Sequence, residues 1–176
     1  MGNIKTLAEV KGVGRIAEAY GNFYDNLESI KVNGGKLITT SQEAKARIAT
    51  AGKEAIGRSE GTYTTAGFEY AKGQMPLFVI DSRLQNPELA RMAVEVNRDE
   101  RYFSTVDTQF YEESLKQAEK DKSKEPWERK VLILPSRGTF NMSPGKNFQP
   151  IEFALRDPKL AKQYFEFNGS IPMTMY

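Results

Sequence analysis

Two short segments of nearly continuous apolar residues constrain the fold of this chain more than any other feature. Residues 75–81 read MPLFVID and residues 131–134 read VLIL. A run of this length, rich in branched and aromatic side chains, is typical of a β-strand that is covered on both faces. We therefore expect both segments to lie inside the sheet of a globular domain.

Segments with helix-forming sequence lie between these two predicted strands and after the second one. The residues Asn86-Pro87-Glu88 combine a capping side chain, a proline at the first helical position and an acid in the first turn, which predicts the start of a helix. The elements predicted after residue 81 are helices over residues 86–97, 108–120 and 149–167, the last interrupted at Asp157-Pro158, and a final strand over residues 171–176. This alternation predicts an α/β fold with a mostly parallel sheet flanked by helices.

The N-terminal part of the chain has a different pattern. Apolar residues recur every three or four positions between Leu7 and Leu27, which predicts an amphipathic helix over residues 4–30. Residues 40–43 (TSQE) have the form of a capping box and predict a second helix over residues 42–56. The N-terminal part is therefore expected to contribute helices rather than strands of the parallel sheet.

A further strand is predicted over residues 63–70. The short connection at residues 72–74 favours an antiparallel hairpin between this strand and the one over residues 75–81. The α/β fold is thus expected to carry an N-terminal helical and β-hairpin extension. We divide the chain into a helical extension, residues 1–58, and an α/β domain, residues 59–176, which together form one compact unit.

Two glycines, Gly12 and Gly14, interrupt the predicted N-terminal helix. Each costs about 1 kcal/mol relative to alanine inside a helix, so the helix either packs closely against a neighbour or breaks there. Residues 7–17 (LAEVKGVGRIA) resemble the helix-hairpin-helix family, whose Gly-apolar-Gly turn offers backbone amides to a DNA phosphate. That family places a small residue four positions after the second glycine, where this chain has Glu18. The resemblance implies a DNA-binding hairpin, and a closely packed helix is the alternative.

The amino-acid composition makes several kinds of chemistry less accessible. The 176 residues include no histidine and no cysteine, which are the usual proton shuttles, thiol nucleophiles and transition-metal ligands. A magnesium or calcium site would need convergent carboxylates, which Asp81 alone does not establish, so we expect neither a metal site nor a cofactor. The 25 basic and 23 acidic residues leave a net charge of +2, which gives no overall attraction to nucleic acid or to a membrane surface.

The two central strands are followed by the same dipeptide. Ser82-Arg83 follows the first strand, and Ser136-Arg137 follows the second. In a parallel sheet the carboxyl ends of neighbouring strands lie at one edge, where arginine and hydroxyl side chains can bind an anion. Residues 129–163, with seven basic and two acidic residues, add positive charge to this region. The candidate ligand-binding residues are Ser82, Arg83, Ser136, Arg137, Thr139 and Lys146.

An enzyme without histidine needs a carboxylate with a raised pKa for acid-base chemistry. Asp81, at the end of a buried strand, is the best candidate. Residues 102–105 (YFST), 131–135 (VLILP) and 138–140 (GTF) resemble parts of ADP-ribosyltransferases. Those enzymes carry a Glu-x-Glu or Gln-x-Glu pair before such a strand, whereas here Glu128 is followed two positions later by Lys130. The resemblance therefore assigns no complete catalytic pair.

These patterns leave three functions open. The first is a soluble protein that binds a phosphate-bearing ligand, either a nucleotide or nucleic acid, at the candidate site. The second is a non-enzymatic structural protein that forms homo-oligomers through its N-terminal helix, and the third is a carboxylate-dependent transferase or hydrolase. The sequence has no apolar run long enough to span a membrane and no secretory signal, so we expect a cytoplasmic location.

Overall fold

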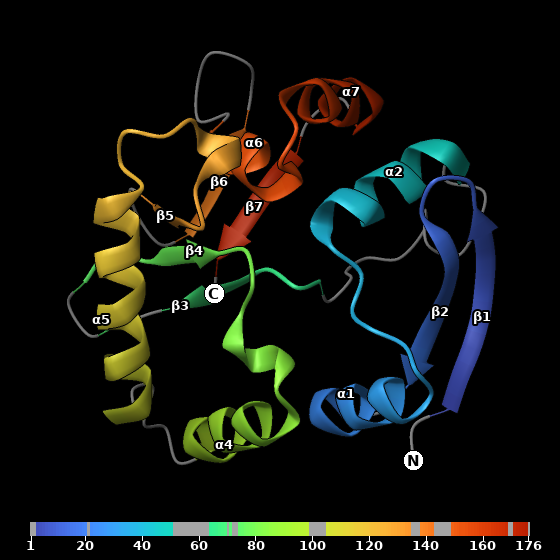
Figure 1. The fold of residues 1–176 in the computed structure, drawn as a ribbon, viewed down its shortest axis with the longest axis horizontal. Coiled ribbons are helices and arrows are strands. Elements are labelled where there is room, and N and C mark those ends of the chain that lie inside the picture. The colour runs from blue at the N-terminus through green and yellow to red at the C-terminus, as the bar shows by residue number, and fades with distance from the viewer. Residues whose placement is uncertain are drawn as a thin grey trace.

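The computed structural model of the chain, drawn in Figure 1, describes residues 3–20, 22–50, 64–69, 71, 74–98, 105–134, 138–142, 149–168 and 171–175. Within these ranges the chain forms helices and three small β-sheets. One sheet is an N-terminal hairpin, one lies at the centre of the molecule, and one pairs two strands from the C-terminal part. No helix in the described ranges is both long enough and apolar enough to cross a membrane.

The N-terminal sheet is an antiparallel hairpin of β1 (Asn3–Val10) and β2 (Gly14–Tyr20). The turn is closed by a hydrogen bond from the Val13 amide to the Val10 carbonyl, at 3.0 Å. Gly12 and Gly14 have φ of +79° and +109°, a backbone region that residues with a side chain rarely adopt. The helix predicted over residues 4–30 is therefore wrong in its first part, because the two glycines form a turn between strands.

The apolar spacing that predicted a helix has a different origin in the hairpin. The pairing register shifts between Thr6 and Ala8, so Leu7 is an extra residue in β1, a β-bulge. The bulge and the turn each shift the alternation of the strand, and the apolar residues fall three apart as a result. The resemblance to the helix-hairpin-helix family is also wrong, because strands and not helices flank the glycine turn.

Two helices follow the hairpin, α1 (Phe23–Val32) and α2 (Thr40–Thr50). The capping box predicted for the second helix is present one residue earlier than expected. The Gln42 amide donates to Thr39 Oγ1 at 3.1 Å, and the Thr39 amide donates to Gln42 Oε1 at 3.0 Å. Residues 51–56, over which this helix was predicted to continue, lie outside the described ranges.

The central sheet has the order β3-β4-β5 and is antiparallel throughout. Its three strands are β3 (Gly67–Glu69), β4 (Leu77–Val79) and β5 (Val131–Ile133). The predicted hairpin between the strands at residues 63–70 and 75–81 is confirmed as β3 and β4. Phe78 and Leu132 pair directly, so the two apolar segments are neighbours, as expected, but they run in opposite directions.

The prediction of a mostly parallel α/β sheet is therefore wrong. The third sheet, formed by β6 (Gly138–Met142) and β7 (Ile171–Met175), is antiparallel too. A parallel pair needs a connection that returns the chain to the same end of the sheet, which one crossover helix achieves. Two helices connect β4 to β5 here, α4 (Pro87–Arg98) and α5 (Thr105–Lys120). Of the two, α5 packs on the sheet, whereas α4 packs against α1. The connection is therefore not the single crossover of a βαβ unit, and the chain enters β5 from the opposite end.

Both faces of the central sheet are covered, as the apolar segments predict. Leu77 and Val131 pack with α5 on one face, in a cluster that includes Tyr111 and Ala118. On the other face, Phe78 contacts Phe153 with a ring distance of 5.0 Å. Phe153 belongs to α6 (Gln149–Leu155), which is followed by α7 (Pro158–Asn168). Burial on both faces anchors this three-stranded sheet although each strand is short.

Two predicted helix starts are confirmed by capping bonds. The Glu88 amide donates to Asn86 Oδ1 at 2.9 Å at the start of α4. The amides of Lys159 and Leu160 donate to Asp157 Oδ1 at 2.8 and 3.2 Å, so Asp157 separates α6 from α7. In each case the side-chain oxygen satisfies backbone amides that have no partner inside the helix.

Candidate functional site

The structure describes only some of the residues of the predicted anion site. Ser82 and Arg83 follow β4, whereas Ser136, Arg137 and Lys146 lie outside the described ranges. The backbone of Thr139 lies in β6, paired with Thr174. Because β4 and β5 are antiparallel, their carboxyl ends lie at opposite ends of the sheet. The two Ser-Arg pairs were expected to meet because parallel strands end at one edge of a sheet, and the antiparallel pairing of β4 with β5 removes that reason.

Arg83 has a clear role within the protein. It belongs to a 3₁₀ turn, η1 (Arg83–Gln85), and its Nη2 forms an ion pair with Glu113 Oε2 of α5 at 2.7 Å. Its guanidinium lies 4.2 Å from the centre of the Phe110 ring. Hydrogen bonds from Gln109 and from Arg83 lower the pKa of Glu113. Arg83 therefore ties the loop after β4 to α5, and binding of an external anion by this residue stays a prediction.

Ser82 and Asp81 differ in exposure. Ser82 is buried, its amide donates to the Thr65 carbonyl at 2.8 Å, and its side chain lies directly against Gly67. A Cβ atom at position 67 would lie 2.7 Å from Ser82 Oγ, so glycine is needed there for packing. Asp81, the candidate catalytic carboxylate, is exposed two residues after β4 rather than buried at its end.

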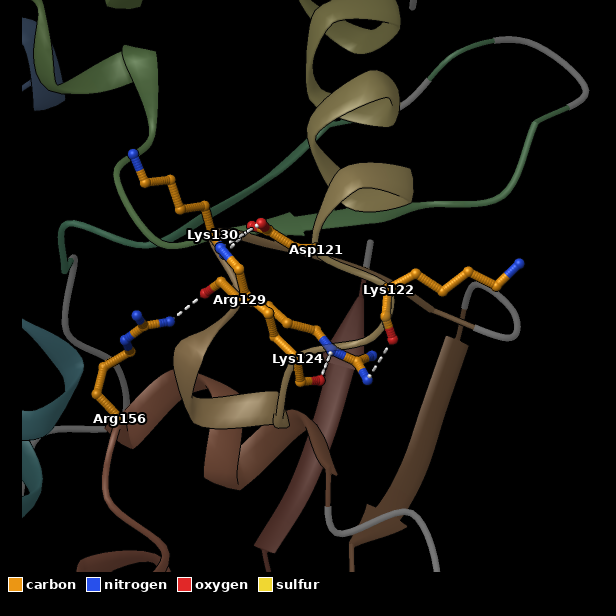
Figure 2. A network of polar contacts seen from close by, with 6 residues as sticks. All are labelled: Asp121, Lys122, Lys124, Arg129, Lys130 and Arg156. Atoms are coloured by element: carbon orange, nitrogen blue, oxygen red, sulfur yellow. Dashed lines mark hydrogen bonds and ion pairs between the residues drawn. The ribbon is translucent and has the colours of Figure 1, made fainter.

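A second polar group, which we call the Asp121 cluster, lies between α5 and β5 (Figure 2). It consists of Asp121, Lys122, Lys124, Arg129, Lys130 and Arg156. Asp121 is fully buried, forms an ion pair with Lys124 Nζ at 2.7 Å and accepts a hydrogen bond from the Lys130 amide at 3.0 Å. These two contacts hold the pKa of Asp121 well below its usual range.

The two arginines of the Asp121 cluster bind backbone carbonyls. Arg129 donates to the carbonyls of Lys124 and Lys122 at 2.8 and 3.2 Å, and Arg156 donates to the carbonyl of Arg129. Asp81, Asp121 and Glu128 act electrostatically on Arg156, so acidic groups offset the positive charge of this region. The Asp121 cluster fixes the connection from α5 to β5 and joins it to the corner between α6 and α7.

The N-terminal hairpin has one face that packs on the rest of the protein and one that does not. Its inner face carries Val10 and Ile16, which are buried with Ala46 of α2. Its outer face carries three cross-strand pairs, because residues directly opposite each other in the register share a face. These pairs are Ile4 with Ala19, Thr6 with Ala17, and Glu9 with Arg15. We call these six residues the outer face.

The outer face is open to solvent. Ile4 keeps 39% of its surface exposed, and Thr6, Glu9, Arg15 and Ala17 are exposed as well. Figure 1 shows β1 at the right-hand edge of the molecule, and α2 lies to the left of both strands of the hairpin. In the described part of the chain the β1–β2 sheet gains no third strand. The sequence analysis missed this surface because it assigned residues 4–30 to a helix, and residues 15–18 show no strict alternation of polar and apolar side chains.

The described residues contain no group of three or more acidic side chains arranged to hold a metal ion. Comparison with protein-family models, with curated proteins and with solved structures finds no match to this chain.

Proposed function

We propose that this protein is a non-enzymatic assembly protein that associates with a second copy of itself through the outer face of its N-terminal hairpin. The observation that carries the proposal is the one-sided burial of this hairpin. Val10 and Ile16 are buried against α2, whereas Ile4 and Ala17 on the other side face solvent.

The stability of small sheets supports this proposal. A two-stranded hairpin gains little from its own hydrogen bonds and needs packing on its faces. Strands of 8 and 7 residues are longer than any strand of the central sheet, each of which has 3. A hairpin this long, covered on one face only, gains further stability when a partner removes the second face from water.

The charge of the outer face favours a neutral partner. Its six residues include one acid, Glu9, and one base, Arg15, so the net charge is zero. Nucleic acid and other strongly anionic partners bind surfaces with an excess of lysine and arginine. This face therefore suits a protein surface of similar composition better than a polyanion.

Measurement of the mass in solution tests the proposal. We expect the full chain to pass from monomer to dimer as its concentration rises over about two orders of magnitude, measured by sedimentation equilibrium. Ala17→Lys places a solvated charge in the middle of the outer face and is expected to shift the chain toward the monomer. Ala49→Lys, at an exposed position of α2, is the matched control and is expected to leave the association unchanged.

Two results would contradict the proposal. The first is a full chain that stays monomeric over the whole range of concentration. The second is an oligomer that Ala17→Lys and Ala49→Lys affect equally, because the outer face would then have no special role in association.

Anion binding at Ser82 and Arg83 is the competing prediction, and a separate measurement addresses it. If it is correct, nucleotides, phosphosugars or oligonucleotides raise the melting temperature of the full chain, and Arg83→Ala removes that increase. An assembly protein without a ligand site shows no such increase with any of these compounds.

A further inference from the structure

We infer that two copies stack hairpin on hairpin, outer face against outer face, about a two-fold axis that runs parallel to the strands. This inference rests on the proposed function and names the geometry of the contact. It follows from the antiparallel register of β1 and β2, which sets the composition of each cross-strand pair.

The two-fold axis determines which residues meet. Rotation about an axis parallel to the strands, midway between the two stacked sheets, places β1 of one copy over β2 of the other without shifting it along the strand. Each outer-face residue then lies opposite the residue that is its own cross-strand partner. Glu9 of one copy faces Arg15 of the second copy, and the same contact occurs twice.

The three cross-strand pairs are complementary under this rotation. Glu9 meets Arg15 with opposite charge, and neither side chain forms an ion pair among the described residues. The large side chain of Ile4 meets the small side chain of Ala19, and Thr6 meets Ala17. Side chains that alternate in size allow two sheets to pack at the usual separation of about 10 Å.

The other simple two-fold arrangement fits less well. An axis perpendicular to the strands, through the central pair of Thr6 and Ala17, would place β1 over β1 in the reverse direction. Glu9 would then lie over Ile4 of the second copy, and Arg15 would lie over Ala19. Charged groups would lose water without gaining a partner, which disfavours this arrangement.

The inferred contact is small. Six residues from each copy is well below the roughly 20–30 residues per partner of a standard interface. We therefore expect weak association that depends on concentration, in which the two charged contacts contribute both to orientation and to specificity. The complete stack would place α2 of each copy on the outside and both hairpins in the middle.

A mixing experiment tests the geometry. Glu9→Arg and Arg15→Glu are made separately, so that each variant on its own places like charges opposite each other. We expect each variant to associate at least about tenfold more weakly than the unmodified chain. An equimolar mixture of the two is expected to form mixed dimers, because the basic outer face then lies opposite the acidic one. Native mass spectrometry with one variant isotope-labelled measures the mixed species.

A second cross-strand pair provides the control. Lys5 and Glu18 are also opposite each other in the register, but they lie on the inner side of the hairpin. Lys5→Glu and Glu18→Lys remove a cross-strand attraction in the same way and are expected to change association much less, with no gain on mixing. This control separates the contact between copies from a loss of stability within one hairpin.

The double variant Glu9→Arg, Arg15→Glu addresses the case in which a single variant does not fold. Its cross-strand attraction is restored, so it is expected to associate with itself and to exclude the unmodified chain. Double-variant chains that form mixed dimers freely with the unmodified chain would overturn the inferred axis.

The outcomes for the geometry and for the proposed function can be told apart. If the unmodified chain associates and Ala17→Lys weakens the association, but mixing the two single variants restores no association, the geometry is wrong and the proposed function stands. If the unmodified chain is monomeric, both are wrong.

Discussion

Individual residues account for two features of this protein that its overall composition does not indicate. Gly12 allows the tight turn of the hairpin, with a φ of +79° and no atom within 4 Å of the place where a Cβ would lie. Asp121 is a fully buried carboxylate that connects Lys124 with the start of β5. The first residue acts through backbone conformation and the second through electrostatics.

We expect Gly12→Ala to lower the free energy of unfolding by about 1 kcal/mol. The open space around Gly12 means that the cost comes only from backbone strain at positive φ. Gly12→Asn is expected to cost less, because asparagine tolerates the left-handed region better than alanine. Urea denaturation of the three chains measures the difference, and an equal effect of both variants would contradict an origin in φ.

We expect Asp121→Asn to lower the free energy of unfolding by about 2 kcal/mol at pH 7, because the buried ion pair with Lys124 is lost. The pKa of Asp121 is lowered in the folded protein, so its contribution is present above the ordinary pKa of 3.8. The contribution is lost as the pH falls below about 4 toward the folded-state pKa. The difference in stability between the two chains should therefore shrink when urea denaturation is repeated at acid pH.

An exposed carboxylate provides the comparison for this experiment. Glu119 lies two residues earlier, and its contact with Lys122 is a longer ion pair of 3.7 Å between exposed side chains. Glu119→Gln is expected to change the stability by less than about 0.5 kcal/mol at either pH. A difference for Asp121→Asn that stays constant with pH would argue against the electrostatic role.

Among the helices, α2 joins two parts of the protein. Ala46 is fully buried against Val10 and Ile16 of the hairpin. Ala44 is buried in a different cluster, with Ile151 of α6 and Leu160 of α7. Small side chains on two sides allow the helix to lie close to both neighbours. The hairpin is thus positioned on the rest of the molecule largely through α2.

We expect Ala46→Leu to destabilise the protein by about 1–3 kcal/mol, because the larger side chain does not fit between α2 and the hairpin. Ala49→Leu, at an exposed position of the same helix, changes the intrinsic helix propensity by the same amount. We expect it to have little effect on the stability of the protein. Thermal unfolding followed by circular dichroism compares the two variants. Equal stability of both would mean that α2 and the hairpin are not closely packed.

The arrangement of the complete molecule places the hairpin at one edge (Figure 1), away from the central sheet. The central sheet is covered by α5 and α6 on its two faces. On the side of the hairpin that faces away from α2, Ile4, Thr6, Glu9, Arg15 and Ala17 are exposed. Association through this face would therefore leave the central sheet and its two helices unchanged.

Association of two folded copies links stability to concentration. We expect the melting temperature of the unmodified chain to rise with protein concentration, since mass action favours the folded dimer over unfolded monomers. Ala17→Lys is expected to remove this dependence while leaving the melting temperature at low concentration nearly unchanged. Differential scanning calorimetry over about two orders of magnitude in concentration measures both effects, and a melting temperature that is independent of concentration for the unmodified chain would contradict the assembly function.

The amino-acid sequence determined the features that depend on neighbouring residues. Asn86 and Asp157 cap helices because their side chains reach amides two or three residues ahead. At the start of α2, Thr39 Oγ1 accepts from the Gln42 amide three residues ahead, and Gln42 Oε1 accepts from the Thr39 amide in return. The apolar segments at residues 75–81 and 131–134 contain the strands β4 and β5, in which every residue except Ile133 is buried.

Contacts between distant residues decided the rest. Phe78 pairs with Leu132 in an antiparallel sheet. Both helices between their strands were predicted, but the order of the elements does not determine the direction in which the chain enters β5. The antiparallel pairing separates the ends of β4 and β5, and Arg83 instead meets Glu113 of α5. The bulge at Leu7 and the turn at Gly12 produced an apolar spacing close to that of a helix. Local periodicity could not distinguish the two structures, because only the pairing of β1 with β2 and the packing of α2 stabilise the hairpin.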